Sequence, residues 1–227
     1  MALAAQPNVQ TRGRPRLRRD EDILRAALHA FADHGYEGMS LRALNAELGL
    51  SRGTINQRFA SKEQLWYAAV DYGFQQLLVD VAAELQRQRD PRDDLTLLRE
   101  NIRAFLIASS RRPELVKLMN HEGLHSTERL DHIVTTFVLP ALSASVDIID
   151  RLSEAGVVRR IPIRTLLFLV AHGAASPFTL KPLSDRFDPL DGRLDVNTHI
   201  EQVTDVIVAG LRSPTEPGTG RQPKRRR

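Results

Sequence analysis

The sequence predicts an all-α protein, and two observations support this fold class. Apolar residues recur at helical spacing along almost the whole chain, whereas no segment shows the sustained alternation typical of a half-buried strand. The composition, with 42% hydrophobic and 26% charged residues, is that of an ordinary globular protein. The length of 227 residues allows one medium-sized domain or two small ones, with enough chain to form a buried core.

The N-terminal part of the chain predicts three helices. The first begins near Asp20, whose side chain can cap it, and ends at Gly35. The second begins at Ser40 and breaks at Gly49. The third follows Ser51, which we expect to be its N-cap. The order is therefore helix, glycine-containing turn, helix.

The rest of the chain predicts longer helices. A fourth helix opens with the capping box Ser61 to Gln64 and runs to the stop at Asp90 and Pro91. Residues 176–195 are rich in Pro, Asp and Gly, which predicts a long loop. The further amphipathic helices are expected at about 92–110, 113–122, 127–154, 163–175 and 197–212.

The composition excludes several classes of protein. The chain has no cysteine, which excludes disulfide frameworks, thiolate nucleophiles and metal centres held by cysteine. The N-terminus lacks the apolar segment of a secretory signal, and the most apolar run, residues 166–175, is shorter than the roughly 18 residues of a membrane helix. We therefore predict a cytoplasmic protein that does not enter a membrane, and no motif for a cofactor is found.

The formal charge of +4 conceals two clusters of arginine at the ends of the chain. Residues 1–19 contain RGRPRLRR and residues 213–227 end in PKRRR. Because neither segment can bury enough apolar surface to offset its ordering entropy, we expect both to be disordered in the free protein. Basic ends of this kind usually meet polyanions, nucleic acid above all.

Residues 40–59, SLRALNAELGLSRGTINQRF, have the size of a helix-turn-helix, whose second helix lies in the major groove of DNA. The spacing alone is equally typical of any helical hairpin with a glycine turn. The surface chemistry favours DNA, because Ile55 and Phe59 turn inward and leave polar side chains outside. These side chains, which can bind base edges or pack beside them, are Ser51, Arg52, Thr54, Asn56, Gln57 and Arg58.

Backbone contacts to DNA have their own candidates. Gly53 leaves room for close approach, while Ser40, Arg42 and Lys62 lie at helix starts, which favour phosphate oxygens. In the N-terminal arm, Arg12, Arg14 and Arg16 resemble the arginines of a short segment that enters an A·T-rich minor groove. A solvated polar helix face and a solvated arm are the alternatives.

Residues 23–66 resemble the DNA-binding domain of the tetracycline-repressor (TetR/AcrR) family of bacterial transcriptional regulators. The matching positions are Ile23, Ala27, Phe31, Gly35, Tyr36, Ser40, Gly49, Leu50, Ser51, Gly53, Thr54, Phe59, Ser61, Lys62 and Glu63. Asn56 and Gln57 depart from the Tyr and His that are usual in the family, and Asn45 stands where an Ala is common. Either the operator half-site or the manner of backbone contact is therefore expected to be unusual, and Asn45 must find a partner or face water.

The resemblance implies a dimeric repressor that binds a palindromic operator and leaves it when a small-molecule effector binds. It therefore also implies that the chain is a regulator and not an enzyme. The helix-turn-helix domain is then followed by a helical bundle for effector binding and dimerisation. The expected segments are a basic arm (1–19), the DNA-binding domain (20–67), the effector-binding and dimerisation domain (68–212) and a basic tail (213–227).

The same resemblance implies that the last two long helices, about 163–175 and 197–212, pair with a second subunit. Their apolar positions suit either an intramolecular core or a dimer interface: Leu166, Leu167, Val170, Val203, Ile207 and Leu211. Apolar and histidine positions of the middle helices are candidates for an effector cavity, although plain core is the alternative. The candidates are Phe105, Met119, His121, Phe137, Phe168 and His172.

Two further classes of function compete with this assignment. Residues 121–125, HEGLH, match the zincin motif, in which two histidines bind zinc and the glutamate is the general base. The motif lies near a predicted helix end without a suitable third ligand, so we expect Glu122 to pair with an arginine such as Arg129 and predict no metal. The other alternative is a ligand-independent architectural DNA binder that uses the arginine-rich arm.

Overall fold

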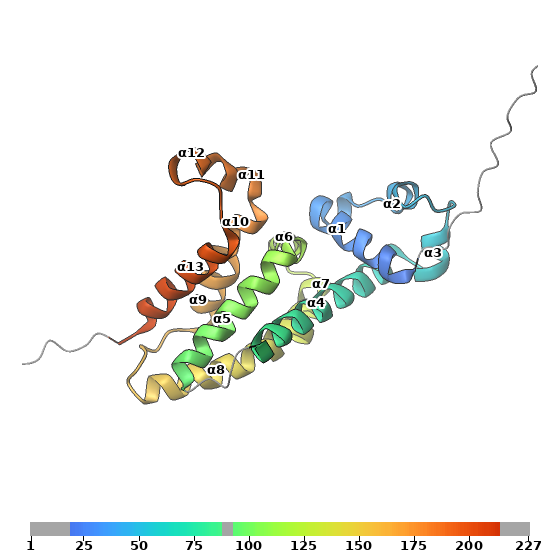
Figure 1. Ribbon diagram of the computed structural model, residues 1–227. Helices are drawn as coiled ribbons and strands as arrows, with labels where there is room; N and C mark the ends of the chain where they lie inside the picture. Colours follow the sequence, from blue (N-terminus) through green and yellow to red (C-terminus); the bar gives the residue numbers. More distant parts are fainter. Residues whose placement is uncertain (1–18, 88–92, 214–227) are drawn as a thin grey trace, which may run out of the picture. The chain divides into compact units, whose positions relative to one another are not determined.

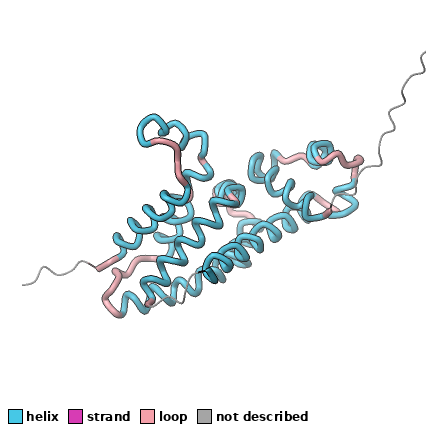
Figure 2. The backbone as a smooth tube through the Cα atoms, in the orientation of Figure 1, coloured by secondary structure: helices cyan, strands magenta, loops and turns pink. Residues whose placement is uncertain are grey.

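The computed structural model describes residues 19–87 and 93–213 of the chain. The described residues form helices joined by turns and loops, apart from one isolated β-bridge between Val158 and Arg212 (Figure 2). The predicted all-α class is therefore confirmed. Residues 1–18 and 214–227, with Arg12, Arg14 and Arg16, lie outside the described residues.

The helices follow one another along the chain as labelled in Figure 1. They are α1 (Asp20–Gly38), α2 (Leu41–Glu47), α3 (Thr54–Phe59), α4 (Lys62–Arg87), α5 (Asp94–Arg111), α6 (Pro113–Glu122), α7 (Glu128–Ile133), the π-helix η1 (Val134–Val138), α8 (Leu139–Glu154), α9 (Ile163–Phe168), the π-helix η2 (Leu169–Ala174), α10 (Ser176–Thr179), α11 (Lys181–Ser184), the 3-10 helix η3 (Asp185–Phe187), α12 (Asp188–Asp191) and α13 (Val196–Leu211).

The chain divides into two compact units that meet in sequence between Tyr72 and Gly73. The first unit holds α1 to α3 and the start of α4, and the second holds the remaining helices. The sequence predicts a domain boundary after residue 67. The boundary in the structure lies later, because the first unit also includes Ala69 and Val70 of α4, which are completely buried.

The first unit is built on a small apolar core. Its buried hydrophobic residues are Ile23, Ala27, Leu28, Phe31, Ala32, Met39, Leu44, Leu48, Ile55, Leu65, Trp66, Ala69 and Val70. Gly35 interrupts α1 where a helix end is predicted, with φ at 69°, and one further turn follows it. The prediction that Asp20 caps α1 is wrong, because Asp20 is the first helical residue and its carboxylate pairs with Arg58 instead.

The second unit is arranged around α5, which packs against α13 and α8 (Figure 1). At the edge of this core Arg99 binds Glu201 at 2.8 Å and Asp205 at 2.9 Å, and these bonds raise the pKa of Arg99. Partly exposed pairs contribute only about 0–1 kcal/mol each, so burial of the apolar residues is the larger stabilising effect. Those residues are Leu98, Ile102, Leu106, Ile107, Ile148, Ile149, Leu152, Val158, Leu166, Val170, Ala174, Ala175, Ile200, Ile207, Val208 and Leu211.

Residues 128–154 form one helix with the π-helix η1 inside it, close to the predicted span. By length and composition this helix is apolar enough to cross a membrane, a feature that the sequence analysis overlooked because it considered only residues 166–175. Core helices of soluble proteins have the same length and apolar composition. Phe137, Ile148 and Leu152 are buried in the second unit, so part of the apolar surface belongs to the core.

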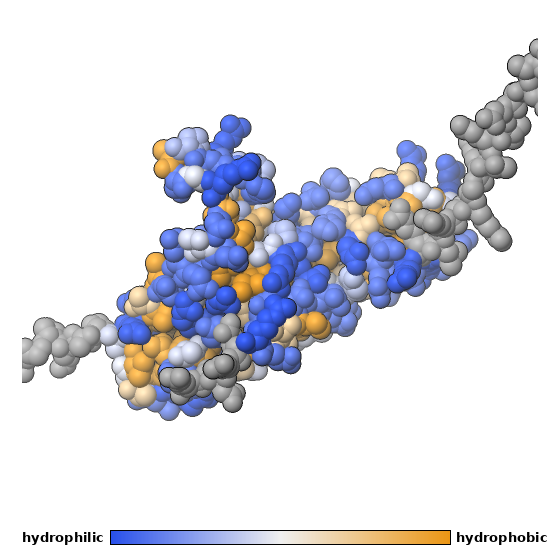
Figure 3. All heavy atoms as spheres, in the orientation of Figure 1, coloured by the Kyte–Doolittle hydropathy of each residue, from blue (hydrophilic) through white to orange (hydrophobic). Residues whose placement is uncertain are grey.

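The prediction of a long loop at residues 176–195 is wrong, because this segment contains the short helices α10, α11 and α12. Pro177, Pro182 and Pro189 each stand in the first turn of one of them. Proline fits this position because its fixed φ suits the helix and its missing N–H would be unpaired there in any case. Apolar side chains of the segment are between 49% and 81% exposed: Leu180, Leu183, Phe187 and Leu190. Figure 3 shows hydrophobic atoms, in orange, at the surface of this segment.

Candidate nucleic-acid interface and apolar cavity

Helices α2 and α3 are held together by the side chain of Asn45, which is 7% exposed. Its amide donates to the Leu41 carbonyl at 2.8 Å, and its carbonyl oxygen accepts from the backbone N–H of Ile55 at 3.4 Å. Asn45 therefore has hydrogen-bond partners inside the first unit and does not face water. At the start of α2 the Ser40 hydroxyl accepts from the N–H of Ala43 at 3.4 Å, as a cap does.

The turn before α3 differs from the predicted one. The residue preceding the helix is Gly53, with φ at 85°, and the prediction that Ser51 is the N-cap is wrong. Residues 51–54 form an additional turn, in which the N–H of Thr54 donates to the Ser51 carbonyl at 3.1 Å. The Ser51 and Thr54 hydroxyls also bond at 2.8 Å. A left-handed backbone conformation favours glycine, because glycine has no Cβ that would clash with the neighbouring carbonyl oxygen.

Helix α3 has one buried and one exposed face. Ile55 is completely buried, whereas Arg52, Asn56 and Gln57 are exposed. Thr54 is half-buried. A guanidinium and two side-chain amides are thus presented together at the surface, and these are the groups that can bind guanine and adenine edges bidentately.

Arg58 lies apart from this group, although the sequence analysis includes it. Its guanidinium binds the carboxylate of Asp20 at 2.9 Å, and its side chain is only 22% exposed. The pair joins α3 to the start of α1. The structure therefore gives Arg58 a bracing contact inside the first unit.

The cations considered for phosphate contact occupy different environments. Arg42 is exposed on α2. Lys62 is half-buried, donates to the Glu37 carbonyl at 3.2 Å and lies 4.8 Å from the centroid of the Tyr36 ring. An ammonium has three N–H donors, so these contacts leave Lys62 able to reach an anion.

A strained turn joins α3 to α4. Ala60 has φ at 61° and ψ at −49°, and the N–H of Ser61 donates to the Phe59 carbonyl at 2.6 Å. These values are those of a γ-turn, a rare and strained conformation for a residue with a Cβ. The sequence analysis did not detect this turn, because an alanine between a helix end and a capping box carries no distinguishing signal.

The HEGLH segment lacks the geometry of a zincin. Helix α6 ends at Glu122, so His121 and His125 do not lie on successive turns of one helix. Glu122 is 5% exposed and binds Arg129 at 3.2 Å and the Thr127 hydroxyl at 3.2 Å, as the alternative interpretation predicted for the arginine. Among residues 19–87 and 93–213 no three His, Cys, Asp or Glu side chains gather in a way that could hold a metal ion.

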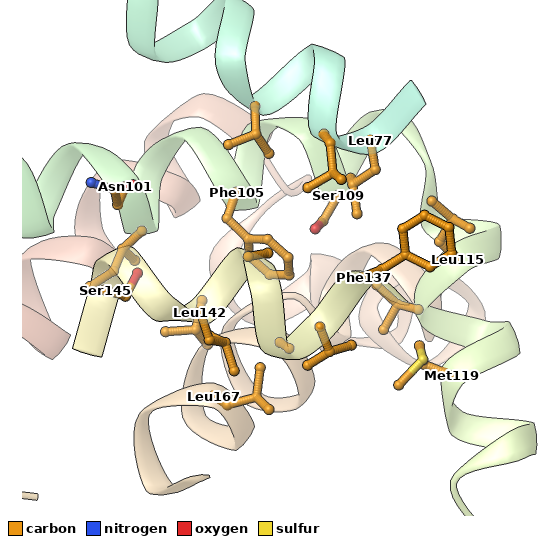
Figure 4. Close-up of a pocket in the computed structure, with 18 of the residues that line it drawn as sticks. Leu77, Asn101, Phe105, Ser109, Leu115, Met119, Phe137, Leu142, Ser145 and Leu167 are labelled. Carbon is orange, nitrogen blue, oxygen red and sulfur yellow. The ribbon is translucent and has the colours of Figure 1, made fainter. Parts of the chain in front are cut away.

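An apolar cavity of about 210 Å³ lies inside the second unit (Figure 4). Four of the predicted effector residues, Phe105, Met119, Phe137 and His172, line it. Further walls come from α4, through residues that the sequence analysis did not select: Phe74, Leu77, Leu78 and Val81.

The other two predicted effector residues lie outside this cavity. Phe168 is 57% exposed and its ring is tilted against that of His172, with the ring centroids 4.9 Å apart, and His121 is exposed at the end of α6. Neither of them lines the cavity. The π-helix η2 begins directly after Phe168, so the ordinary helical register does not predict which side chains turn inward.

Comparisons with known proteins identify the first unit. Residues 23–69 match the family described as bacterial regulatory proteins, tetR family. The HTH-type transcriptional repressor AcnR of Corynebacterium diphtheriae is 46% identical over 50 residues, which are 22% of this chain and 26% of AcnR. An uncharacterised HTH-type transcriptional regulator of Mycobacterium tuberculosis is 28% identical over 146 residues, which are 59% of this chain and 70% of that protein. The chain thus matches only about a quarter of the length of AcnR.

Solved structures are similar over most of the chain. The ketosteroid transcriptional regulator KstR2 of Mycobacterium tuberculosis has a TM-score of 0.62 at 18% identity, over 88% of this chain and 98% of that one. A bacterial regulatory protein of the tetR family from Rhodococcus RHA1 has a TM-score of 0.60 at 18% identity, over 87% and 100% of the two chains. These matches confirm the predicted fold, a helix-turn-helix domain followed by a helical domain.

The two positive-φ turns that flank α3 give a stability prediction. Gly53→Ala is expected to lower the free energy of unfolding by about 1–2 kcal/mol, because the added Cβ meets open space but strains the backbone. Ala60→Gly, which relaxes a φ of 61°, is expected to leave that free energy unchanged or to raise it by up to about 1 kcal/mol. Urea unfolding measures both variants. Equal losses in the two variants would contradict the assigned turns.

Proposed function

We propose that this chain, which belongs to the TetR family of bacterial regulatory proteins, is a cytoplasmic repressor that binds double-stranded operator DNA through residues 40–62 of its first unit. Proteins of this family regulate transcription and are not enzymes. Repression is supported by the similarity to AcnR, a transcriptional repressor.

One observation carries the proposal: Arg52, Asn56 and Gln57 are exposed around α3, while Ile55 on its other side is completely buried. A helix held in this way can enter the major groove with its polar side toward the bases. Arginine binds guanine and the two amides bind adenine. We assign base contacts to these three residues, with Ser51, Gly53 and Thr54 close to the DNA backbone.

Phosphate contacts complete the interface in this proposal. Arg42 and Lys62 supply positive charge on either side of α3 in sequence, and Ser40 supplies a hydroxyl. Arg58 is bound to Asp20, so we assign it to bracing rather than to base recognition. We assign a minor-groove contact to Arg12, Arg14 and Arg16, which removal of residues 1–18 tests separately.

Operator recognition by a dimer requires a surface for the second subunit. Four of the predicted interface residues, Leu166, Val170, Ile207 and Leu211, are buried in the core of their own unit, and Leu167 and Val203 are half-buried. Other apolar residues of the same helices are 47% to 70% exposed: Phe168, Leu169 and Val206. We assign the dimer interface to this exposed set, because exposed apolar surface on a single chain marks an interaction site.

Release by an effector follows from linkage between two sites. The helix α4 contributes Trp66 to the core of the first unit and Phe74 and Leu77 to the cavity of the second. A ligand that prefers a dimer whose recognition helices are not about 34–36 Å apart weakens operator binding by its differential affinity for the two states. By the same linkage, operator DNA weakens binding of the ligand.

Selection of bound duplexes from a random pool tests the proposal. The wild-type chain is expected to enrich a palindrome with half-sites about 10 base pairs apart. Arg52→Ala and Gln57→Ala are each expected to lose about 1–3 kcal/mol of discrimination at one position of each half-site, because each removes a base contact. Lys62→Ala is expected to weaken all sequences about equally and to reduce the salt dependence.

Two controls accompany the selection. Arg58→Ala is expected to lower the melting temperature with the base preference unchanged, because it breaks the pair with Asp20. A chain that lacks residues 1–18 is expected to select the same palindrome. Unchanged selection by both Arg52→Ala and Gln57→Ala would contradict the proposal, and loss of all binding on removing residues 1–18 would favour the architectural alternative.

The dimer interface gives a separate prediction. Val206→Lys places a charge on a side chain that is 70% exposed in the single chain, and it is expected to convert the dimer into a monomer in sedimentation velocity. Val79→Lys, at a side chain on α4 that is 59% exposed, is the matched control and is expected to remain dimeric. The opposite pattern would move the interface to α4.

A further inference from the structure

The wall of the cavity in the second unit contains one fully buried polar atom without a hydrogen-bond partner. Ser109 on α5 is 1% exposed, and its hydroxyl has no hydrogen-bond partner among the described residues. The next residue behaves differently, since the Ser110 hydroxyl donates to the Ile107 carbonyl at 2.8 Å. Figure 4 shows the Ser109 hydroxyl pointing toward the space between Phe105 and Phe137.

An unpaired buried hydroxyl costs free energy, so native proteins rarely retain one without a ligand or a water to bind it. Asn101, a second polar residue of the wall, already donates its amide to the Leu97 carbonyl at 2.8 Å. Ser145, a third polar residue of the wall, is only half-buried. Ser109 is therefore the fully buried donor that a molecule in this cavity would satisfy.

The cavity wall is electrically neutral. Arg112 is its one charged lining residue, and its guanidinium binds Asp80 at 2.7 Å, with both side chains about a quarter exposed. Asp80 balances the charge of this guanidinium through its contact with Nε, so a ligand carboxylate would meet an ion pair with no net charge. His172 bonds to the Asn120 side chain at 2.8 Å, and burial lowers its pKa, which favours the neutral imidazole. An ion of either sign would thus lose its hydration without gaining a partner of unbalanced opposite charge.

Apart from Ser145, the remaining walls are apolar, and they set the size of the occupant. An apolar cavity of about 150 Å³ holds a benzene molecule. By proportion, the volume of about 210 Å³ accommodates about eight non-hydrogen atoms. Phe74, Phe105, Phe137 and Met119 are the large walls, and methionine adapts to irregular shapes.

Both π-helices contribute to the cavity, which strengthens its assignment as a binding site. Phe137 and Val138 of η1 and Val170, Ala171 and His172 of η2 line it. A π-helical turn is less favourable than an α-helical one and is found frequently at functional sites. Two such turns at one cavity indicate that its shape is specified rather than left by imperfect packing.

We infer that this cavity binds an uncharged, largely apolar molecule of about eight non-hydrogen atoms, one oxygen of which accepts a hydrogen bond from the Ser109 hydroxyl. The inference rests on the proposed function in one respect only, namely that the cavity is the effector site. It assigns the chemical class of the effector as a neutral alcohol, ketone or ester with an aliphatic or aromatic body.

Isothermal titration calorimetry with three probes of matched length tests the class of ligand. The full-length chain is titrated with 1-octanol, octanoate and octylammonium. Octanol is expected to bind with an affinity at least about 10-fold higher than that of either ion, because only the neutral probe avoids burying an unpaired charge. Equal or tighter binding of octanoate or octylammonium, or no binding of octanol, would overturn the inference.

Two serine variants test the assigned donor. Ser109→Ala is expected to weaken octanol binding about 10-fold and to leave the melting temperature unchanged or higher, because no hydrogen bond within the protein is lost. Ser110→Ala, the neighbour on the same helix, does not line the cavity and is expected to leave octanol affinity unchanged. Octanol affinity that does not depend on Ser109, or a melting temperature lowered by Ser109→Ala, would assign the serine a structural role and overturn the inference.

The calorimetry is performed without DNA, so its failure is distinct from failure of the proposed function. A chain that selects a palindrome but does not bind octanol contradicts the ligand class alone. Octanol binding that requires Ser109 but leaves operator affinity unchanged supports the ligand class and contradicts the role of the cavity as effector site.

Discussion

The orientation of α3 depends on the burial of Ile55 and on the hydrogen bonds of Asn45, and the proposed DNA interface depends on that orientation. Ile55 is completely buried, and its N–H donates to the Asn45 side chain, which also holds α2. A helix of six residues is too short to be stable alone, so its position comes from these tertiary contacts. Because one face is fixed inward, Arg52, Asn56 and Gln57 must face the solvent.

The second unit relies on a different constraint. Its helices pack around α5, yet the packing leaves a cavity where close-packed side chains would be more stable. The unpaired Ser109 hydroxyl and the two π-helices at the same walls add to the cost. A ligand that fills the cavity in one of the two functional states accounts for all three features. The occupant then stabilises one arrangement of the helices, including α4, which is shared by both units.

The sequence predicts the helices and the exposed polar side of α3 well because both follow from local patterns. Periodic apolar residues and the capping residue Ser40 place α2, α5, α6 and the helix of residues 128–154 within about two residues. What it misses depends on tertiary contacts. The pairing of Arg58 with Asp20 joins positions far apart in the chain. The exposure of Phe168 follows from a π-helix, and the unpaired Ser109 has the same surroundings in sequence as any helical serine. The periodicity of apolar residues predicts neither the Arg58–Asp20 pair, nor the exposure of Phe168, nor the unpaired hydroxyl of Ser109.

The most direct test of the account is methylation interference on a duplex that the chain binds. Methyl groups at guanine N7 lie in the major groove, whereas those at adenine N3 lie in the minor groove. If α3 binds bases as proposed, guanine N7 methylation in two symmetric half-sites will block binding, and the block at one guanine of each half-site will disappear in Arg52→Ala. Interference confined to adenine N3, unchanged in that variant, would contradict major-groove recognition by α3.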